Sequence, residues 1–421
     1  MTHAVKVRYA KGPVFKGLER VFFLMKFAGG FIFGAIVLTT GVNAATIQIE
    51  GFADVRLIAP SAQDTYLDGG LGKLRYGEDD ANLKLGNIVG ELRAQQDEWF
   101  AQADGRIDTE YGTALDLTEA FVGYAPPTRT NWSWSARVGA FFPPFSLENE
   151  NVGWSTFWTV TPSAINSWVG AEVRTIGAEG TLAWRSNGNA VTLIGSVFGF
   201  NDTNGVLIAE RGWNFDDRIS GLFEKERLPD AVAIAGGRAP PSTIHVFHET
   251  DDRPGWYLDL SYEIDGKTGF ELMRYDNEAD AMRPRSWHTT FWEAGFRQQI
   301  GNVTILSQAM RGDTIRRTSA AAFTASDFQS AYALVGWDLT DWWLAARADI
   351  FQTRTRTAAG PSPLSEDGHA FDATVTWLPR NWLRLSAEYL LVEDTRAQRL
   401  VEGDAAHQTE TQFQFVIRTY F

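Results

Sequence analysis

The chain lacks the groups on which most enzymes depend. None of its 421 residues is a cysteine, which excludes both a disulfide framework and a thiol nucleophile. Six histidines occur, and none lies in a recognisable nucleophile motif. His245 and His248, followed by Glu249, lack the helical spacing of a zinc protease, and residues three apart on a strand point to opposite faces. We therefore expect no enzymatic activity, no metal and no cofactor.

Basic side chains are in the minority. The sequence has 52 Asp and Glu against 38 Lys and Arg, a formal net charge of −14. Six of the basic and one of the acidic side chains lie in residues 1–44, which leaves 32 basic and 51 acidic ones, a net charge of −19, in the remainder. Nucleic acid is excluded as a partner because its phosphates need a basic surface.

Long apolar runs are missing as well, apart from one near the amino terminus. Residues 27–38 are apolar, follow Lys16, Arg20 and Lys26, and precede Val42-Asn43-Ala44. This order is typical of a secretory signal and is too short for a membrane-spanning helix. We predict that residues 1–44 are a signal peptide, with Met25 as an alternative start, and that residues 45–421 form one domain. An amphipathic amino-terminal helix is the alternative.

What the sequence does contain is alternation, most clearly at its end. From Gln412 to Phe421, Phe413, Phe415, Ile417 and Phe421 fall on one face of a strand, and mostly polar residues fall on the other. A period of two with one apolar and one mostly polar face indicates a β-strand between two different media. An aromatic carboxy-terminal residue resembles the closing strand of outer-membrane β-barrels, which the barrel-assembly machinery recognises.

The same pattern repeats through the chain in segments long enough to cross a bilayer at a tilt. Sixteen strands are predicted: 46–58, 84–95, 99–109, 117–125, 132–142, 173–185, 190–200, 255–264, 268–276, 286–299, 303–311, 328–338, 342–354, 369–377, 382–393 and 409–421.

The connections alternate strictly between short and mostly longer ones. Seven are short and rich in turn formers, such as Ser186-Asn187-Gly188-Asn189 and Asp265-Gly266-Lys267. Eight are longer: 59–83, 110–116, 143–172, 201–254, 277–285, 312–327, 355–368 and 394–408. This parity predicts an all-β fold, a sixteen-stranded antiparallel transmembrane barrel with short periplasmic turns and long external loops.

The apolar face of each strand must meet lipid, because a charge there costs roughly 2–4 kcal/mol at the bilayer midplane. The polar face then lines an interior that sixteen strands make too wide for side chains alone to fill, which predicts an aqueous channel. The expected lumen-lining residues are Arg56, Arg93, Asp104, Arg106, Arg137, Arg347, Asp349, Arg384, Glu388 and Arg418. Alternatively, the arginines simply pair with neighbouring wall acids. The facing of strands 6, 9 and 11 is not assigned.

Two short segments resemble a known family. Leu117–Tyr124 (LTEAFVGY) and Val138–Phe145 (VGAFFPPF) are similar to the pattern of the Gram-negative phosphate-selective and related trimeric porins. The resemblance implies a sixteen-stranded, homotrimeric, passive diffusion channel in the outer membrane. Phosphate selectivity does not carry over, because it depends on clustered Arg and Lys at the constriction, and residues 143–172 contain neither.

In such porins the third external loop folds inward and narrows the lumen, and residues 143–172 hold that position. The expected constriction residues are Glu148, Glu150, Trp154, Trp158, Trp168 and Glu172. Acid on this loop opposite wall arginines would make a transverse field that orients polar solutes. The tryptophans either stack on sugar rings or pack the loop against the wall. For residues 201–254 a cap over the pore, a latch onto a neighbouring subunit and a mobile surface loop stay open, as does a short helix over 219–228.

The function we expect is a passive channel for small hydrophilic solutes and ions. A sugar- or anion-preferring channel is the first alternative, and a structural, adhesive or enzymatic barrel is a weaker one.

Overall fold

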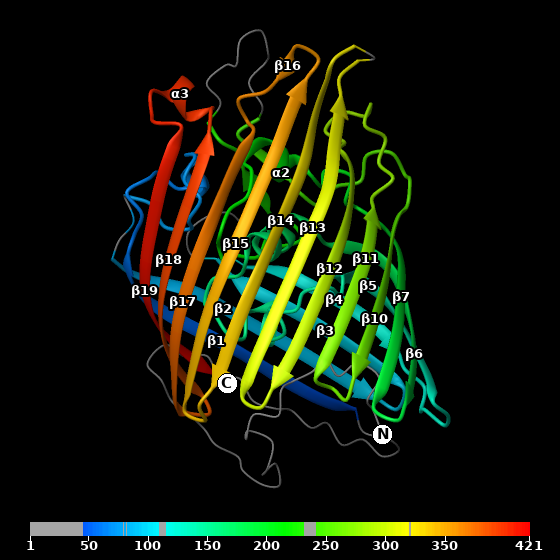
Figure 1. Cartoon of the computed structure of the whole chain (residues 1–421). Coiled ribbons are helices and arrows are strands. Elements are labelled where there is room, and N and C mark those ends of the chain that lie inside the picture. The colour runs from blue at the N-terminus through cyan, green and yellow to red at the C-terminus, as the bar shows by residue number, and fades with distance from the viewer. Residues whose placement is uncertain (1–44, 79, 81, 109–114, 231–240, 320) are drawn as a thin grey trace.

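A computed structural model describes residues 45–421 except positions 79, 81, 109–114, 231–240 and 320. The predicted signal peptide, residues 1–44, lies outside the described residues, as does its alternative start, Met25. The described residues form a tall barrel of tilted strands with several chain segments inside it (Figure 1).

Sixteen strands make the wall, and every neighbouring pair is antiparallel. They are β1 (Thr46–Ala59), β2 (Leu83–Gln96), β3 (Trp99–Ile107), β4 (Leu115–Tyr124), β5 (Trp132–Phe141), β6 (Thr175–Ser186), β7 (Asn189–Gly199), β10 (Gly255–Ile264), β11 (Thr268–Asp276), β12 (His288–Ile300), β13 (Val303–Arg317), β14 (Phe323–Asp338), β15 (Trp342–Thr357), β17 (Glu366–Arg380), β18 (Leu383–Arg396) and β19 (His407–Tyr420). The first and last strands pair from Phe52 opposite Tyr420 to Ala59 opposite Phe413, which closes the barrel. The predicted sixteen-stranded antiparallel barrel is therefore confirmed.

The smaller elements lie in the long connections. They are η2 (Tyr66–Asp68), η3 (Val152–Trp154), α1 (Ala164–Glu172), α2 (Val206–Glu210), the paired strands β8 (Lys225–Arg227) and β9 (Thr243–His245), β16 (Gly360–Pro361) and α3 (Arg399–Glu402). We call residues 60–82 loop 1, residues 142–174 loop 3 and residues 200–254 loop 4. Loop 3 is three residues longer than predicted, because β5 ends one residue earlier, at Phe141, and β6 begins two residues later, at Thr175.

Several strands are longer than the sequence predicted. The predicted segments 303–311 and 328–338 are Val303–Arg317 and Phe323–Asp338, and they pair without interruption to the level of Arg317 and Phe323. The extra residues include Asp313, Arg316 and Arg317, whose polarity hides the strand from an alternation count. Backbone hydrogen bonds between neighbouring strands nevertheless continue there, because a hairpin can extend beyond the apolar band into water.

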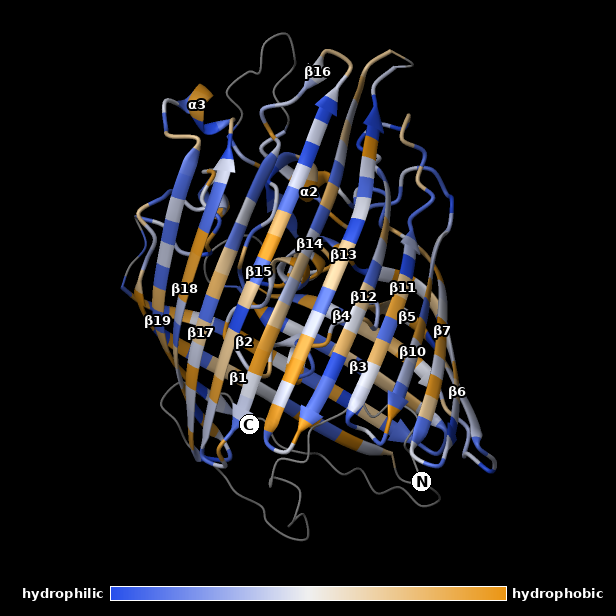
Figure 2. Ribbon diagram, viewed as in Figure 1, coloured by the Kyte–Doolittle hydropathy of each residue, from blue (hydrophilic) through white to orange (hydrophobic). Residues whose placement is uncertain are grey.

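The two faces of the wall differ as the alternation predicts. On β1, Val55 and Leu57 are exposed on the outside, whereas Asp54 and Arg56 are buried within the barrel. Apolar and polar positions alternate along the wall strands in Figure 2. The described residues contain no helix long and apolar enough to span a membrane.

On β11 to β14 the inner face also carries many apolar residues, beside polar ones such as Gln308. Met273, Tyr275, Phe291, Met310 and Phe328 are all buried in one hydrophobic cluster inside the barrel. Trp168 of loop 3 and Trp213 of loop 4 belong to the same cluster. Of the predicted strands 6, 9 and 11, whose facing was not assigned, β11 and β13 bury apolar side chains on the inner face beside the inserted loops, whereas β6 directs Glu179 into the interior.

Tight turns fix the register of the hairpins at one end. Asn187 and Gly188 between β6 and β7 have φ of 49° and 83°, and Asp265 and Gly266 between β10 and β11 have φ of 51° and 65°. Two successive residues with positive φ match the right-handed twist of the flanking strands, and Asn-Gly and Asp-Gly adopt that conformation most readily. Aromatic pairs such as Trp342 and Trp377, with ring centroids 5.8 Å apart, lie on the wall near this end.

The facing of the wall predicts which positions water reaches. In a chain without native cysteine, an Arg137→Cys variant should react with a membrane-impermeant, charged thiol reagent in vesicles, because Arg137 lines the interior. The neighbouring Val138→Cys variant is the matched control and should be protected, because Val138 is 62% exposed on the outer face that lipid covers. Labelling of Val138→Cys alone would reverse the facing of β5.

Candidate functional site

Loop 3 crosses the interior of the barrel. Its helix α1 begins after Ser163, whose side chain accepts a hydrogen bond from the Asn166 amide at 3.3 Å. The Glu148 carboxylate accepts from the Ser163 amide at 2.8 Å and from Asn166 Nδ2 at 2.7 Å, so it also satisfies the amino-terminal end of the helix. All nine residues of α1 are buried, which is the pattern of a helix surrounded by protein.

Polar side chains on several strands hold this loop. Arg347 on β15 donates to the Thr161 carbonyl at 2.7 Å and to the Pro162 carbonyl at 3.0 Å. Glu388 on β18 accepts from the Thr161 amide at 2.9 Å. Gln308 on β13 donates to the Phe145 carbonyl at 2.8 Å, and Arg297 on β12 pairs with Glu150 at 3.0 Å. On β2, Glu91 accepts from the Gly153 amide at 3.3 Å. Because these strands are distributed around the wall, the loop spans the lumen.

The tryptophans of loop 3 have their ring faces occupied. Trp154 stacks on Phe142 with centroids 4.0 Å apart and an interplanar angle of 5°. Trp158 meets Phe157 edge-on at 5.0 Å and packs over Gly336 of β14. Trp168 is 1% exposed and donates through Nε1 to Glu172 at 2.6 Å. Of the two alternatives for these tryptophans, stacking on sugar rings or packing loop 3 against the wall, the arrangement corresponds to packing.

Loop 4 also lies inside the barrel, in contact with loop 3. Trp213 donates through its amide to Glu366 at 2.6 Å and through Nε1 to the Gln352 carbonyl at 3.1 Å. The Phe215 amide donates to the Lys73 carbonyl of loop 1 at 2.8 Å. The described part of loop 4 is thus no free surface segment. The alternative of a short helix over 219–228 is wrong, because Lys225–Arg227 form the strand β8.

The reason for this difference is electrostatic. Glu224 and Glu226 both bind Arg218, Glu226 through a 2.6 Å hydrogen bond from Nη1. Residues two apart point to the same side of an extended chain, whereas a helix would place them about 200° apart. Arg218 also donates to Asp108 at 2.7 Å, and Arg106 of the wall pairs with Asp108 at 3.0 Å. Burial raises the pKa of Glu226, but Arg218 and Arg211 lower it to about 2.

Asp217 is the centre of a second network, which joins loop 4 to the first and last strands. It accepts from Arg56 at 2.5 Å and from Arg75 of loop 1 at 2.8 Å, and Arg418 lies 4.0 Å away. Asp54 bridges the two wall arginines, at 2.8 Å from Arg56 and 2.7 Å from Arg418. Burial alone would raise the pKa of Asp217, but Arg56 and Arg75 hold it well below its usual range.

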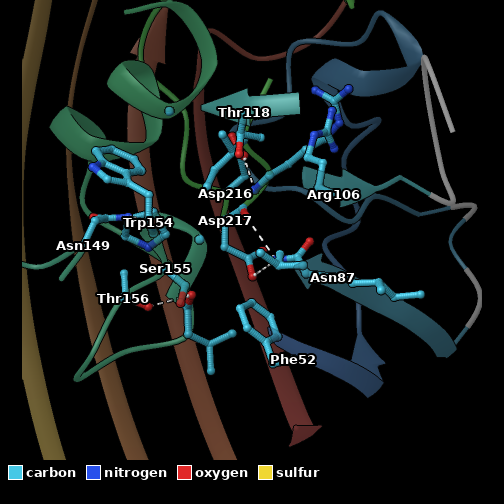
Figure 3. Close-up of a pocket in the computed structure, with 18 of the residues that line it drawn as sticks. Phe52, Asn87, Arg106, Thr118, Asn149, Trp154, Ser155, Thr156, Asp216 and Asp217 are labelled. Carbon is cyan, nitrogen blue, oxygen red and sulfur yellow. Dashed lines mark hydrogen bonds between the residues drawn. The ribbon is translucent and has the colours of Figure 1, made fainter. Parts of the chain in front are cut away.

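A cavity remains below these loops. It has a volume of about 360 Å³ and is lined by β2 to β7, β10 to β12 and the first part of loop 3. A much narrower gap of about 30 Å³ separates loops 3 and 4 from β1, β2 and β3 (Figure 3). Asn149 and Trp154 line both spaces, and Asn149 Nδ2 donates to the Trp154 carbonyl at 2.8 Å. The interior is therefore wide at one end and narrow beside Trp154.

The predicted site residues divide into two groups. Glu150, Trp154, Arg93, Asp104 and Arg137 line the larger cavity. The others are buried among the loops and the wall: Glu148, Trp158, Trp168, Glu172, Arg56, Arg106, Arg347, Asp349, Arg384, Glu388 and Arg418. Glu148 and Glu172 of loop 3 do not face wall arginines across an open gap. Glu148 lies 3.5 Å from Arg347 in direct contact, and Glu172 accepts from the Leu207 amide of α2 at 2.9 Å.

Sequence reasoning missed several participants. Asp217 and Arg218 were not singled out within residues 201–254, and Glu119, Glu179 and Asp259 were not selected either. The apolar residues on the inner face of β11 to β14 were the available signal, since a lumen that contains only water does not need them.

Comparison with solved structures places the fold. The outer-membrane channel DcaP of Acinetobacter baumannii is 9% identical, with a TM-score of 0.51 over 90% of this chain and 97% of that one. A complex of Salmonella typhi OmpF with daunomycin is 11% identical (92% and 100% covered, TM-score 0.48), and in-vitro folded OmpT of Vibrio cholerae is 10% identical (92% and 100%, TM-score 0.47). No family model and no curated sequence matches. The likeness to DcaP supports the fold, a closed barrel of the kind found in an outer-membrane channel.

The Asp217 network predicts the effect of removing one charge. An Asp217→Asn variant leaves Arg56 and Arg75 buried without their shared carboxylate, which costs about 3–5 kcal/mol for a broken buried pair. Loop 4 should detach, and trypsin should cleave it after Arg218 or Lys225 faster than in the wild type. Asp230→Asn, which removes an exposed pair with Arg227, is the control and should not change the rate. Equal cleavage rates for Asp217→Asn and the wild type would contradict this role.

Glu172 gives loop 3 a dependence on pH. Burial raises its pKa to about 7, although the Leu207 amide and Trp168 donate to it. The folded state therefore binds the proton more tightly than the unfolded chain, and stability falls as pH rises from the unfolded pKa near 4.5 to about 7. The free energy of unfolding should lose about 3 kcal/mol from this group over that range.

Chemical unfolding in detergent at pH 4.5 and pH 8 measures this loss by comparison with Glu172→Gln. The variant should lack this part of the pH dependence and gain relative stability at pH 8. Identical pH profiles for the two proteins would show that the carboxylate is not the titrating group.

Proposed function

We propose that the chain is a passive diffusion channel for small hydrophilic solutes and ions across the outer membrane. The observation that carries this proposal is the closed barrel with a polar inner face, in which loop 3 spans the lumen and leaves a cavity of about 360 Å³. A cavity of about 360 Å³ and a gap of about 30 Å³, both lined by Asn149 and Trp154 of loop 3, suit a pore that admits small solutes and excludes large ones.

Loop 3 is the proposed constriction. Glu150 and Trp154 line the larger cavity and would meet a passing solute, whereas Glu148, Trp158, Trp168 and Glu172 hold the loop in place. On the wall, Arg93, Asp104 and Arg137 line the same cavity. The remaining predicted lumen residues would influence the pore indirectly, because they hold the inserted loops in place. They are Arg56, Arg106, Arg347, Asp349, Arg384, Glu388 and Arg418.

The alternatives receive less support. Sugar channels need exposed aromatic faces, but Trp154 already stacks on Phe142. An anion channel needs basic groups in excess, and the larger cavity has more carboxylates than guanidinium groups. An enzymatic barrel needs a nucleophile beside a base, and no motif of that kind occurs in the sequence. A structural or adhesive barrel would leave the cavity of about 360 Å³ without a role.

Export and assembly follow from the same proposal. Residues 1–44 would direct secretion, and the strand that ends at Phe421 would engage the barrel-assembly machinery. A homotrimer in the lipid bilayer is the proposed assembly. The backbone groups of Phe421 and Gly51 exchange two 3.0 Å hydrogen bonds, so the final residue is part of the closing seam.

Conductance in planar bilayers tests the function. The purified protein should open in steps, in groups of three for a trimer, and the reversal potential under a salt gradient should name the preferred ion. Deleting residues 148–161 should increase the conductance severalfold, because it removes the segment that crosses the lumen. Deleting Asp404 and Ala405, in the exposed loop after α3, is the control. Unchanged conductance in the first deletion would place loop 3 outside the conducting path.

A further inference from the structure

The narrow gap beside Trp154 is too small for an organic solute as it stands. Its volume of about 30 Å³ leaves room for about two water molecules. Of the side chains that line this gap, Trp154 is the largest, and it also lines the larger cavity (Figure 3). Because the same ring bounds both spaces, its position decides how wide a passage between them is.

The backbone at Trp154 has an unusual conformation. Trp154 has a φ of 58° and follows Gly153, whose φ is 59°, and bulky side chains rarely adopt this left-handed region. The Asn149 side chain fixes the turn through its 2.8 Å hydrogen bond to the Trp154 carbonyl. Residues held in such a region cluster at functional sites, because the surrounding structure has to maintain them. Loop 3 thus maintains an unfavourable turn that places an indole ring at the gap.

A stack of three groups holds the indole ring. Trp154 lies parallel to Phe142 with ring centroids 4.0 Å apart, and the Arg174 guanidinium carbon lies 3.3 Å from the Phe142 centroid. At such short distances each group lies over a face of the Phe142 ring, and one face cannot hold both. Phe142 is therefore sandwiched between Trp154 and Arg174. On the far side of the indole, Gly170 leaves the necessary space, since a Cβ there would lie 3.2 Å from the Trp154 ring.

Arg174 has the ring face as a main contact. It is fully buried, and its Nη2 donates to the Ser220 carbonyl at 3.1 Å, whereas Nε and Nη1 donate no hydrogen bond within the described part of the chain. Burial lowers the pKa of Arg174 to about 9, although Glu119 acts against this, so the group stays charged at neutral pH. A desolvated guanidinium is attracted to an aromatic face.

The middle of the stack is fixed on the wall. The Phe142 amide donates to Glu119 of β4 at 2.8 Å, and the Phe142 carbonyl accepts from Arg137 of β5 at 3.3 Å. Both backbone polar groups of Phe142 are therefore bound to wall side chains. Because Phe142 cannot shift and Arg174 covers one of its faces, the other face offers Trp154 a fixed support.

The charged residues around the gap already have partners. Arg106 pairs with Asp108 at 3.0 Å, Asp217 with Arg56 at 2.5 Å, Arg218 with Glu226 at 2.6 Å and Arg418 with Asp54 at 2.7 Å, and Asp216 accepts from the Arg218 amide at 2.8 Å. A solute in the gap therefore meets charges that other side chains neutralise, so its width matters more than its charge.

We propose that the Trp154 ring sets the largest cross-section of solute that the channel passes, and that Arg174 positions this ring through Phe142. Arg174 is a positioning residue, because it lines neither the gap nor the larger cavity. The inference rests on the proposed function, since a size limit has meaning only for a channel. It adds to that function the side chain that determines the limit, the group that holds this side chain, and selection by width.

Conductance and sugar permeation of the full-length protein test the role of Trp154. Trp154→Gly removes the ring and suits the left-handed backbone, and Trp154→Ala removes the ring alone. Both variants should increase single-channel conductance severalfold in planar bilayers. In liposome swelling, both should admit raffinose at a rate closer to that of arabinose. The reversal potential under a salt gradient should not shift, because no charge changes. Trp337→Ala, which removes an exposed indole from the outer face of β14, is the matched control.

A double-variant cycle tests the role of Arg174. Arg174→Leu removes the cation from the Phe142 ring and should increase the conductance, because Trp154 is held less firmly, whereas Arg174→Lys retains a cation and should stay near the wild type. In the Trp154→Gly background, Arg174→Leu should have no further effect, since residues that act through one contact are not additive. If Arg174 served only to hold loop 4 through Ser220, the conductance would increase equally in both backgrounds.

The outcomes separate this inference from the proposed function. Equal conductance in the wild type and both Trp154 variants would overturn the inference and leave the channel standing, whereas no current from the wild type or from Trp154→Gly would overturn the proposed function. Trp158→Ala removes a packed ring of loop 3 that lines neither space, and it should conduct like the wild type. An increase equal to that of Trp154→Ala would assign the size limit to loop 3 as a whole. Circular dichroism verifies that each variant is folded.

Discussion

Ion pairs between the wall and the inserted loops are the interaction on which this structure depends. A sixteen-stranded barrel is too wide for its own side chains to fill, so whatever occupies the lumen must be held there. Arg56, Arg347 and Arg418 are almost completely buried, and each lies near a loop carboxylate: Arg56 at 2.5 Å and Arg418 at 4.0 Å from Asp217, and Arg347 at 3.5 Å from Glu148. A buried charge without a partner is strongly destabilising, so the wall arginines and the loop carboxylates constrain one another.

The two halves of the lumen therefore have different characters. On the side of β11 to β14, aromatic and aliphatic residues pack against Trp168 and Trp213, so the loops are attached by a hydrophobic contact that needs no matching charges. On the side of β1 to β3, charged networks around Asp217 and Arg218 attach loop 4. The narrow gap lies on this second side, where polar groups rather than apolar ones meet.

Much of the barrel could be predicted from sequence because it is periodic. Alternation on β1 and β19, and turn residues such as Asn187-Gly188, are local signals, and two of the predicted strands, 255–264 and 268–276, have the observed bounds. The positions of the loops could not be predicted in the same way. Glu148 resembles any acidic loop residue until Arg347, 199 positions later, is known to lie beside it. The strand ends at Arg317 and Phe323 were missed because polarity there reflects water and not a turn.

The Asp217 network also connects the ends of the chain. Its partners come from loop 1, from β1 and from β19, and the Asp54–Arg418 bond joins residues 364 positions apart. The complete set of partners exists only after the last strand has paired with the first, because Arg418 arrives with β19. Contacts of such sequence separation form late in folding, since the chain entropy of closing the loop must be overcome first. The Asp217 network, which holds loop 4 in the lumen, is therefore complete only in a closed barrel. An intact network indicates that the first and last strands have paired.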